Sequence, residues 1–550
     1  MNAIEIHEVD FSYGQSSLAA DGAKALNGIT LGIAQGEFVA LSGRNGSGKS
    51  TFLKLCKALL LPSAGVVSVQ GIDTSDAAQL WEIRRRSGMI FQDPDSQIIG
   101  TTVTEDVAFG PENLGLPPHV IRERVQDALQ ALGLQDLAYA ETHLLSGSQK
   151  FRLALAGLVA MQPDCLLIDE AASAPDPRDR KEIMTLLRTL NRERGITVVH
   201  VTRDVEEIAT ADRVIILDRG EIALDGTPAQ FFSCKSRVDM AVSEGPQATD
   251  PCGAGAADTG SRGPSDAHRS SDAGRTPGHI LTDAVGRYFH GDTILHRADP
   301  RTKIALTLLI MTALFVFESF TALTLMLTIT LTLAAMSGKP LRHSLRGLRL
   351  VIYLALVAAV ANLISIKGTP LLDYGLLRHM SREAVEKSAT MVLRLALLAS
   401  TASLLTSTTP PFAMAAGGET LLRPLSRIGV PVSRFATMLL ISLRFLPVIV
   451  EEAARLIRLR SAGAGDFNRG SLLRRIRSCL PLLVPLLQSV AHRGDAMATA
   501  LDARCYRGSA GRTRMKPLAF SAADLAYAGV VLVILSGLAG VEYLAQQKPF

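Results

Sequence analysis

The sequence is poor in cysteine and in charged residues for a chain of 550 residues. Its six cysteines are scattered, without a CxxC pair or an accompanying histidine cluster. This spacing argues against a metal site or a disulfide framework and fits a reducing cytosol. Charged residues make up only 20% of the chain, and the mean hydropathy is +0.23, which is high for a soluble enzyme. We therefore expect a chain that is partly immersed in lipid.

The beginning of the sequence also lacks the basic region and apolar stretch of a secretory signal. A chain of 550 residues is too long for one hydrophobic core, so we expect two or more domains. The net charge of +5 is compatible with nucleic-acid binding, but its distribution favours an explanation by membrane topology instead. We therefore expect no nucleic acid as a partner.

Composition divides the chain into three parts. Residues 1–235 alternate short apolar strands, such as CLLIDE and ITVVHVT, with helical stretches, which predicts an α/β domain with a mainly parallel sheet. Residues 236–282 are rich in Gly, Ser, Asp, Ala and Pro, which is typical of a flexible linker. Residues 283–550 are dominated by long apolar runs, which predict an all-α integral membrane domain.

Five apolar runs are close to the roughly 20 residues that cross about 30 Å of hydrocarbon. They lie at 304–317, 320–337, 348–366, 389–406 and 523–545. Only Glu318 and Ser319 separate the first two, which predicts two spans joined by a tight hairpin. The sequence thus predicts about five spans.

The segment from about 411 to 516 is apolar but unsuited to crossing. The run Phe435–Val450 is interrupted by Arg444 and Pro447, and a charge at mid-bilayer costs about 2.5–3.5 kcal/mol even on lenient scales. We interpret this segment as long amphipathic helices; the alternative is that Phe435–Val450 forms a sixth span. Arginines crowd the segment, and positive residues near spans stay cytoplasmic, so these helices and the N-terminal domain are expected on one side of the membrane.

A phosphate-binding loop stands near the start of the chain. The stretch GRNGSGKS fits G-x-x-x-x-G-K-[ST], follows the strand EFVALS and opens a helix. Its glycines let backbone amides surround phosphate oxygens, Lys49 should reach the β- and γ-phosphates, and the Ser50 hydroxyl should bind Mg²⁺. The residues expected to bind ATP here are Gly43, Asn45, Gly46, Ser47, Gly48, Lys49, Ser50 and Thr51.

Two carboxylates and a glutamine complete the expected chemistry. The strand CLLIDE ends in Asp169, expected to hold Mg²⁺, and Glu170, placed to act on the attacking water as a general base. Gln92, in IFQDPDSQ, follows another apolar strand and is expected to sense both the γ-phosphate and Mg²⁺.

Further motifs make residues 1–235 resemble the ATP-binding cassette (ABC) ATPases. These are LSGSQ at 145–149, which contributes Ser146, Gly147 and Gln149, and Asp176 after the second acidic motif. Tyr13 matches the aromatic residue that stacks on adenine in that family. The resemblance implies that two such domains enclose two ATP molecules, each between the phosphate loop of one domain and the LSGSQ helix of the other.

The chain departs from this family at several positions. Arg203 stands where the family has a histidine that relays hydrogen bonds between the glutamate, water and γ-phosphate, and an arginine cannot act as a base. His200 lies three residues earlier and is expected to point elsewhere. The other departures are Ser148, Ala171, Ala172 and Pro175. We expect ATP binding to survive and hydrolysis at the Lys49 site to be slow; the alternative is that Arg203 replaces the histidine in holding γ-phosphate.

The membrane half carries its own resemblance. HRADPRTK at 296–303, STTPP at 407–411 and the basic helical segment resemble the transmembrane T component of energy-coupling factor (ECF) transporters over about 283–550. In that family two Ala-Arg-Gly motifs dock on the ATPases. The second corresponds to Ala503-Arg504-Cys505, and the first to Ala462-Gly463-Ala464, where the arginine is missing. The first docking contact is therefore expected to be weakened, unless Arg458 or Arg460 takes its place. Arg504 is expected to fit an acidic groove whose candidate residues are Asp93, Asp95, Glu105 and Asp106.

The whole chain thus resembles an ATPase–T fusion of an ECF importer for a vitamin or a metal ion. The resemblance implies ATP and Mg²⁺ as cofactors, a second ABC ATPase and a separate substrate-binding membrane subunit as partners, and a cell-membrane location with the ATPase domain in the cytoplasm. Two other interpretations stay open. One is an exporter of the ABC half-transporter type, and the other is a membrane-tethered ATP-binding regulator with weak hydrolysis.

Overall fold

A computed structural model describes most of both halves of the chain. The described residues are 2–13, 24–170, 177–233, 293, 298–317, 319–336, 341–365, 382–463, 472–508, 511–515 and 520–546. The predicted linker, residues 236–282, lies outside the described residues. The chain divides into two compact units: Met1–Ser271 with Phe467–Pro517, and Asp272–Asp466 with Leu518–Phe550. The first unit thus joins the N-terminal domain to a segment from the membrane half.

The first unit contains two sheets. A six-stranded sheet has the order β10-β9-β3-β8-β7-β6, in which only β10 is antiparallel to its neighbour, and a four-stranded antiparallel sheet has the order β2-β1-β4-β5. The predicted α/β domain with a mainly parallel sheet is confirmed. The strands are β1 Asn2–Phe11, β2 Leu26–Ala34, β3 Phe38–Ser42, β4 Ala64–Val69, β5 Ile72–Asp73, β6 Ser87–Ile90, β7 Cys165–Asp169, β8 Thr197–Val201, β9 Arg213–Asp218 and β10 Glu221–Gly226.

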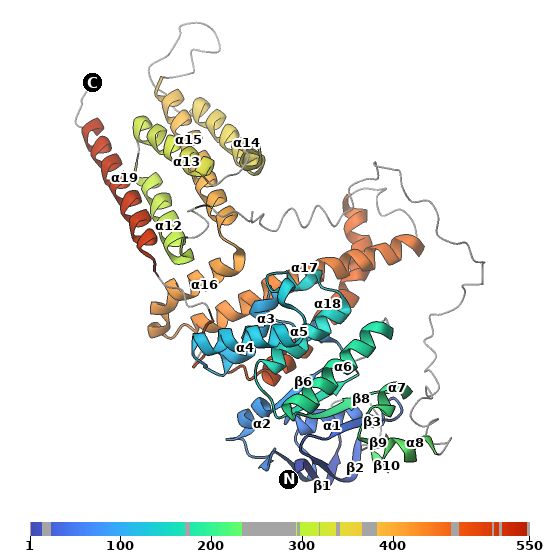
Figure 1. Cartoon of the computed structure of the whole chain (residues 1–550). Coiled ribbons are helices and arrows are strands. Elements are labelled where there is room, and N and C mark those ends of the chain that lie inside the picture. The colour runs from blue at the N-terminus through green and yellow to red at the C-terminus, as the bar shows by residue number, and fades with distance from the viewer. Residues whose placement is uncertain are drawn as a thin grey trace. The chain divides into compact units, whose positions relative to one another are not determined.

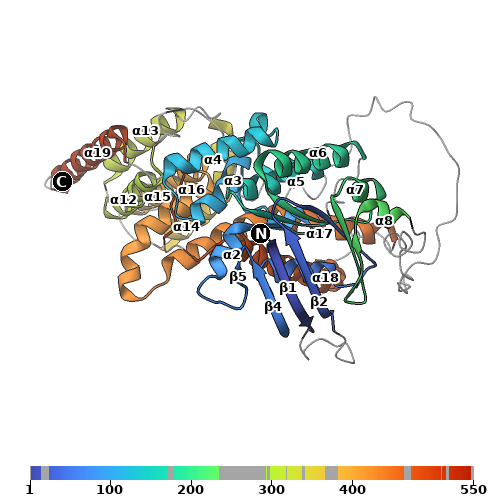
Figure 2. The same cartoon turned by 60° about the horizontal axis from the view of Figure 1, so that its bottom comes forward.

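Alternating side chains of the six-stranded sheet build two cores. Phe38 and Ala40 of β3 pack into one core together with the helices α3, α4, α5 and α6, whereas Val39 and Leu41 pack into the other with α1 and the four-stranded sheet. Figures 1 and 2 show these two layers on opposite faces of the sheet. The helices of this unit are α1 Lys49–Cys56, α2 Leu80–Arg86, α3 Val103–Asn113, α4 Pro118–Ala131, α5 Gly147–Val159, α6 Pro177–Arg194, α7 Val205–Ala209, α8 Pro228–Phe232 and α18 Leu472–Ala503, with short 3₁₀ turns η1 Pro94–Gln97, η2 Gln135–Leu137 and η3 Thr142–Leu144.

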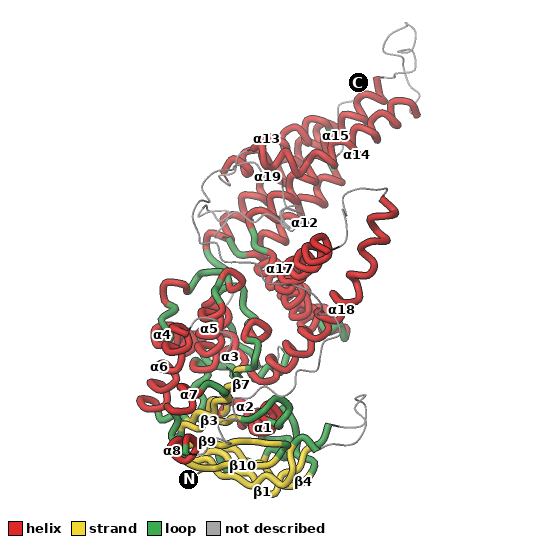
Figure 3. The backbone as a smooth tube through the Cα atoms, turned by 90° about the vertical axis from the view of Figure 1, so that its right-hand side faces the viewer, coloured by secondary structure: helices red, strands yellow, loops and turns green. Residues whose placement is uncertain are grey.

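The second unit is helical. Its elements are α12 Pro300–Val316, α13 Phe320–Met336, α14 Leu341–Ser365, α15 Arg382–Thr408, α16 Pro411–Leu422, η6 Arg423–Ile428, α17 Val432–Gly463 and α19 Ala522–Gln546. Figure 3 shows α12, α13, α15 and α19 side by side, and Leu314, Leu323, Leu397 and Leu538 meet in their shared core.

The predicted apolar runs coincide with α12, α13, α14, α15 and α19. Two of the described helices are long and apolar enough to cross a membrane, Glu383–Thr408 and Ala522–Gly540. The number of spans therefore remains a prediction. Residues 435–450 lie inside one long helix, α17, which continues beyond them to Gly463.

Charged side chains satisfy the backbone where α12 ends and α13 begins. An Arg394 guanidinium nitrogen on α15 donates to the carbonyl oxygen of Phe317 at 2.8 Å, and the Glu542 carboxylate on α19 accepts from the Ser319 backbone N–H at 3.0 Å. Backbone groups inside a bilayer need hydrogen-bond partners within the protein, and charged side chains there are usually paired with polar groups. The two contacts meet both requirements, because each joins a charged side chain to a backbone group at the short connection between α12 and α13.

We expect Arg394→Met to destabilise the helical unit by about 1–3 kcal/mol, because it leaves a part-buried carbonyl without its donor. The measurement is the melting temperature of the detergent-solubilised chain, followed by helical circular dichroism. Lys387→Met, an exposed substitution on the same helix, is the matched control. Equal melting temperatures for the two variants would contradict this account of Arg394.

Candidate functional site

The phosphate loop connects β3 to α1 through glycines that no other residue can replace without strain. Gly43 and Gly48 have φ values of +145° and +102°, and a Cβ atom at either would lie 2.1 Å from the Leu217 carbonyl oxygen or 2.5 Å from that of Ala25. Both the dihedral angles and the close backbone neighbours exclude a side chain. The loop is therefore shaped by neighbouring strands as well as by its own sequence.

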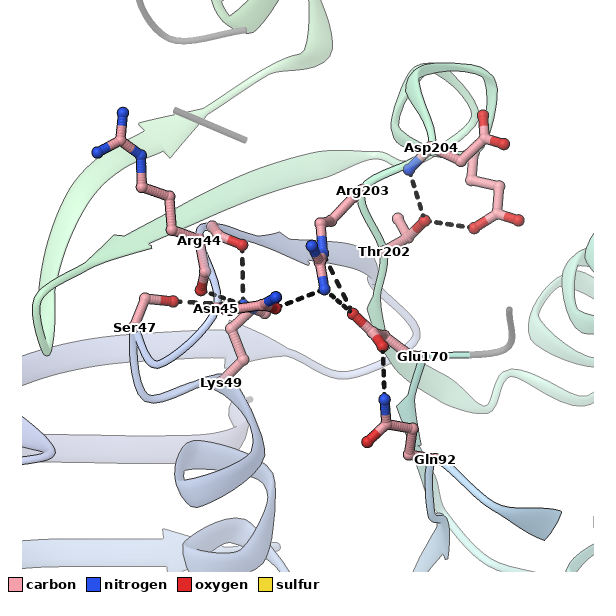
Figure 4. Close-up of polar contacts among 11 residues, drawn as sticks. Arg44, Asn45, Ser47, Lys49, Gln92, Glu170, Thr202, Arg203 and Asp204 are labelled. Atoms are coloured by element: carbon pink, nitrogen blue, oxygen red, sulfur yellow. Dashed lines mark hydrogen bonds and ion pairs between the residues drawn. The ribbon is translucent and has the colours of Figure 1, made fainter. Parts of the chain in front are cut away.

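Lys49 lies inside this loop. Its Nζ donates to the carbonyl oxygens of Gly43 at 2.8 Å and Arg44 at 2.7 Å, and approaches Ser47 Oγ at 3.4 Å (Figure 4). Burial, assisted by the nearby charge of Arg203, lowers the pKa of Lys49 below its usual value. A buried cation surrounded by a loop of backbone groups is suited to an anionic phosphate.

Ser50 and Asp169, the two residues at which the sequence predicts magnesium ligands beside Gln92, lie next to the phosphate loop. Burial raises the pKa of Asp169, although a hydrogen bond with the Ser50 hydroxyl opposes the shift. A buried carboxylate next to a serine hydroxyl fits Mg²⁺, which usually takes one or two protein oxygens together with phosphate oxygens and water. Within the described ranges, no group of three or more His, Cys, Asp or Glu side chains is placed to hold a metal by itself. The expected ligands Ser50 and Asp169 are thus neighbours.

Glu170 is the centre of the polar contacts at this site. It follows β7 with a φ of +47°, and its Oε2 accepts from Gln92 Nε2 at 3.0 Å. Its Oε1 accepts from Arg203, at 2.8 Å from Nη2 and 3.2 Å from Nε, and the same Nη2 donates to Asn45 Oδ1 at 2.5 Å (Figure 4). Both carboxylate oxygens of the expected base therefore already accept hydrogen bonds, and Arg203 connects that base to the phosphate loop.

His200 takes no part in this arrangement. It is buried in β8, and its Nε2 lies 2.9 Å from the Glu207 carboxylate on α7. Hydrogen bonds from His200 and Thr202 lower the pKa of Glu207 against the opposing effect of burial, which is the largest single influence. As expected, His200 points elsewhere and does not replace the missing histidine.

Tyr13 lies at the beginning of α1. Its hydroxyl is 3.0 Å from Thr51 Oγ1, and its ring meets Phe11 edge to face with centroids 5.0 Å apart. Tyr13 is 53% exposed. The geometry thus places an aromatic platform next to the phosphate loop.

The LSGSQ residues lie at the N-terminus of α5. Ser146 and Gln149 form a reciprocal capping box around Gly147. In the part of the chain that the structure describes, no hydrogen bond joins these residues to the phosphate loop. Asp176, together with residues 171–175, lies outside the described residues.

Arg504 contacts the cassette at one of the four acidic residues that the sequence analysis named as candidates. Its Nη1 lies 3.1 Å from Asp106 Oδ1, and the side chains of both residues are almost fully buried, at 3% and 0% exposure. Asp106 Oδ1 also accepts from the backbone N–H groups of Ile99 and Gly100, at 2.6 and 3.0 Å. Asp106 is thus the buried partner of Arg504.

The other acidic candidates have other contacts. Asp95 pairs with Lys150 at 2.9 Å, Glu105 caps α3, and Asp93 caps the η1 turn. Arg504 instead contacts Asp106 and Asn113, and the Asn113 side chain donates to the Arg504 carbonyl oxygen at 3.0 Å.

Sequence reasoning missed the residues that follow Arg504. Arg507 lies over the ring of Trp81 at 4.4 Å, and Arg512 pairs with Glu112 at 2.8 Å. Tyr506, whose ring stacks near Phe109, offers the one available sequence signal, an aromatic residue within a basic stretch.

The third residue of the second Ala-Arg-Gly motif also differs from the family. Cys505 replaces the glycine of the family motif, and its φ is +58°, a region where glycine is unstrained and a residue with a Cβ atom is not. Burial raises the pKa of its thiol. The backbone keeps the glycine-type conformation although the glycine is gone.

Known proteins match both parts of the chain. Residues 26–173 match the family model described as ABC transporter, and residues 291–516 match the one described as cobalt transport protein. An energy-coupling factor transporter ATP-binding protein of Clostridium perfringens is 44% identical over 249 residues, which covers 45% of this chain and 88% of that protein.

A second relative matches almost the whole chain. It is described as an ABC transporter ATP-binding protein of Bifidobacterium longum and is 32% identical over 530 residues, 93% of this chain and 61% of its own length. Among solved structures, cbiO1 of Clostridium perfringens, described as part of the ABC transporter complex cbiONQ, is 36% identical with a TM-score of 0.39, covering 43% of this chain and 92% of its own.

We expect Tyr13→Ala to weaken ATP binding about tenfold, because base–aromatic stacking is worth about 1–3 kcal/mol. Tyr13→Phe keeps the ring and loses only the hydrogen bond to Thr51, so it should bind ATP nearly as well as wild type. The measurement is equilibrium titration of the detergent-solubilised chain with a fluorescent ATP analogue. Equal losses for both variants would contradict a stacking role.

Proposed function

Because the chain belongs to the ATP-binding cassette family, as an energy-coupling factor cassette fused to a transmembrane coupling domain, we propose that it energises an importer of a vitamin or a transition-metal ion. The observation that carries this proposal is the buried Arg504–Asp106 ion pair, which attaches the end of α18 to the nucleotide-binding domain. The end of α18 with Arg504, called the arm from here on, can therefore move when the cassette moves. The substrate itself would be bound by a separate membrane subunit.

At the nucleotide site, the chain's own residues bind ATP and Mg²⁺ and orient them. Lys49 and the loop amides bind the phosphates, Ser50, Asp169 and Gln92 hold Mg²⁺, and Tyr13 positions the base. When bound, Mg²⁺ neutralises charge that develops on the phosphate oxygens. Ser146, Gly147, Gln149 and Asp176 act on the ATP shared with the partner cassette.

Hydrolysis at this site is slow in our proposal. Glu170 has to accept a proton from water, but Arg203 already holds its Oε1 in an ion pair. Taking the proton would weaken that attraction, and arginine cannot relay protons as histidine does. A second ABC ATPase therefore supplies the faster site.

The location of the protein is proposed from the distribution of its positive residues. We propose a multi-pass protein of the cell membrane whose cassette and arginine-rich helices face the cytoplasm, since positive residues stay on that side. The partners are the second ATPase, the substrate-binding subunit and the lipid bilayer.

Growth and uptake measurements test the function. Deleting the chain from its source cells should abolish uptake of one radiolabelled vitamin or metal ion among a panel, and the wild-type chain should restore it. Arg504→Met should fail to restore uptake although ATP binding persists, because the arm no longer holds the cassette. Asp495→Asn, an exposed substitution on α18, is the matched control and should restore it.

A second candidate function is favoured by the Glu170–Arg203 ion pair. A membrane-tethered regulator that binds ATP and hydrolyses it weakly would also suit an occupied base. Unchanged uptake of every panel substrate after deletion would support the regulator and contradict the importer.

We expect Arg203→His to raise turnover at the Lys49 site about tenfold or more, because it frees Glu170 and restores a group that can relay protons. The measurement is ATP hydrolysis by the intact complex in which the partner's own general base has been removed, so that only this site turns over. Arg192→His, an exposed substitution on α6, should leave the rate unchanged.

Two outcomes would contradict the slow-site proposal. One is a fast wild-type rate at this site that Glu170→Gln abolishes. The other is a lower rate in Arg203→His, which would show that the arginine holds the γ-phosphate in place of the histidine.

A further inference from the structure

The helix α2 contacts the arm and the residues that follow it. The Arg507 guanidinium lies over the Trp81 ring at 4.4 Å, and the Cys505 thiol lies 3.8 Å from the Trp81 carbonyl oxygen. The Arg84 guanidinium lies 3.8 Å from the Asp502 carboxylate on α18. These contacts are separate from the buried ion pair on α3, so two elements of the cassette hold the end of α18.

The same helix α2 also contacts the end of the phosphate-loop helix α1. Lys57, which follows α1, is 0% exposed, and its Nζ donates to the carbonyl oxygen of Arg84 at 2.6 Å and to that of Ser87. Arg84 lies in the last turn of α2, where carbonyl oxygens lack partners within the helix and a cation is favoured. Burial lowers the pKa of Lys57 to about 8. A charge that is costly to bury thus stands where it connects α1 to α2.

Arg84 completes this connection from the side of α2. Its Nη2 donates to the carbonyl oxygen of Ala58 at 3.2 Å, and its Nη1 is the atom that faces Asp502. Ala58 has a φ of +51°, a left-handed conformation that costs energy for a residue with a Cβ atom. One guanidinium therefore touches both the turn after α1 and the end of α18.

The helix α1 connects the phosphate site to Lys57. It begins with Lys49 and Ser50, the residues expected at the phosphates and at Mg²⁺, and most of its residues are buried. Its eight residues span only about 12 Å. A short helix packed on most sides moves as one body, so a displacement at the phosphate loop also displaces Lys57.

The residues after the arm are anchored on α3 as well. The Thr513 backbone N–H donates to the Glu112 carbonyl oxygen at 3.1 Å, and the Met515 side chain packs into the core that α3, α4 and α5 share. The segment is thus held on both sides of its contact with α2. A shift of α2 would therefore change the orientation of the arm while the arm stays bound.

From these contacts we propose that Lys57 is a positioning residue for ATP-driven transport, which passes movement of the phosphate-loop helix through α2 to the arm. This inference rests on the proposed function, in which the arm moves with the cassette. The path uses α1 and α2, whereas the contact through Asp106 uses α3 and the segment after Gln92. A lysine with only a structural role would stabilise the cassette without carrying a signal from the nucleotide.

Trp81 reports on this path, because it lies on α2 and is the only tryptophan in the sequence. In the detergent-solubilised full chain, a non-hydrolysable ATP analogue with Mg²⁺ should change Trp81 emission. Lys57→Met should lose this change although it still binds the analogue, as measured by equilibrium dialysis. Lys181→Met, the same substitution at an exposed lysine on α6, is the matched control and should keep the change.

Two results of this experiment would overturn the proposal. One is a wild-type emission that does not respond to the analogue. The other is a Lys57→Met variant that binds the analogue and responds as strongly as wild type, since Lys57 would then have only a structural role.

ATP affinity tests the path from its other end. Coupling between two sites is reciprocal, so removing the contact of Arg507 with α2 should change the dissociation constant of ATP about threefold or more. Arg507→Met is compared with Arg192→Met, an exposed substitution on α6 that should have no effect. In a chain that already carries Lys57→Met, Arg507→Met should leave the dissociation constant unchanged.

An unchanged ATP affinity in Arg507→Met would overturn the proposal, and so would an equal effect with and without Lys57. Because Arg507 is exposed, the first of these results decides the question even where Lys57→Met does not fold. Neither measurement requires transport. A failed uptake panel would contradict the importer, whereas the Trp81 and affinity results contradict only the path through Lys57.

Discussion

One desolvated ion pair organises the nucleotide-binding unit. Two charges removed from water are tolerable only when each has the other, and Asp106 and Arg504 are both almost fully buried. The same carboxylate oxygen holds the backbone N–H groups of Ile99 and Gly100, just before α3. The segment after Gln92, the start of α3 and the arm are therefore fixed by a single acceptor. With Gly157 beside the guanidinium, the LSGSQ helix shares this contact. In the proposed mechanism, any movement of these elements on ATP binding reaches the arm directly.

A second carboxylate plays the corresponding role at the nucleotide. Glu170 accepts from Gln92 on one oxygen and from Arg203 on the other, and Arg203 also binds Asn45 of the phosphate loop. Three motifs that are far apart in the sequence thus meet at one side chain. The arrangement favours a well-ordered site over a reactive one, since the hydrogen bonds that position the carboxylate also engage its lone pairs.

The sequence predicted the features that depend only on neighbouring residues in the chain. The phosphate loop, the strand that ends in Asp169 and the helical runs of the membrane half are continuous stretches whose residue types dictate their conformation, and the structure has each of them. Asp106 was one of four acidic candidates, and burial separates it from the others. The contacts of Arg203 with Asn45 and of Arg512 with Glu112 join residues separated by about 150 to 400 positions, and no periodicity encodes such pairs. The span count was not decided either, because it depends on a bilayer as well as on helix length.

Met515 places the last piece of the cassette's core after most of the membrane helices in chain order. A ribosome therefore completes residues 24–233 long before it makes the side chain that fills their interior. Between the two events, the ribosome synthesises α12 to α18. The core of the cassette is therefore closed only after every described element of the helical unit except α19 has been synthesised.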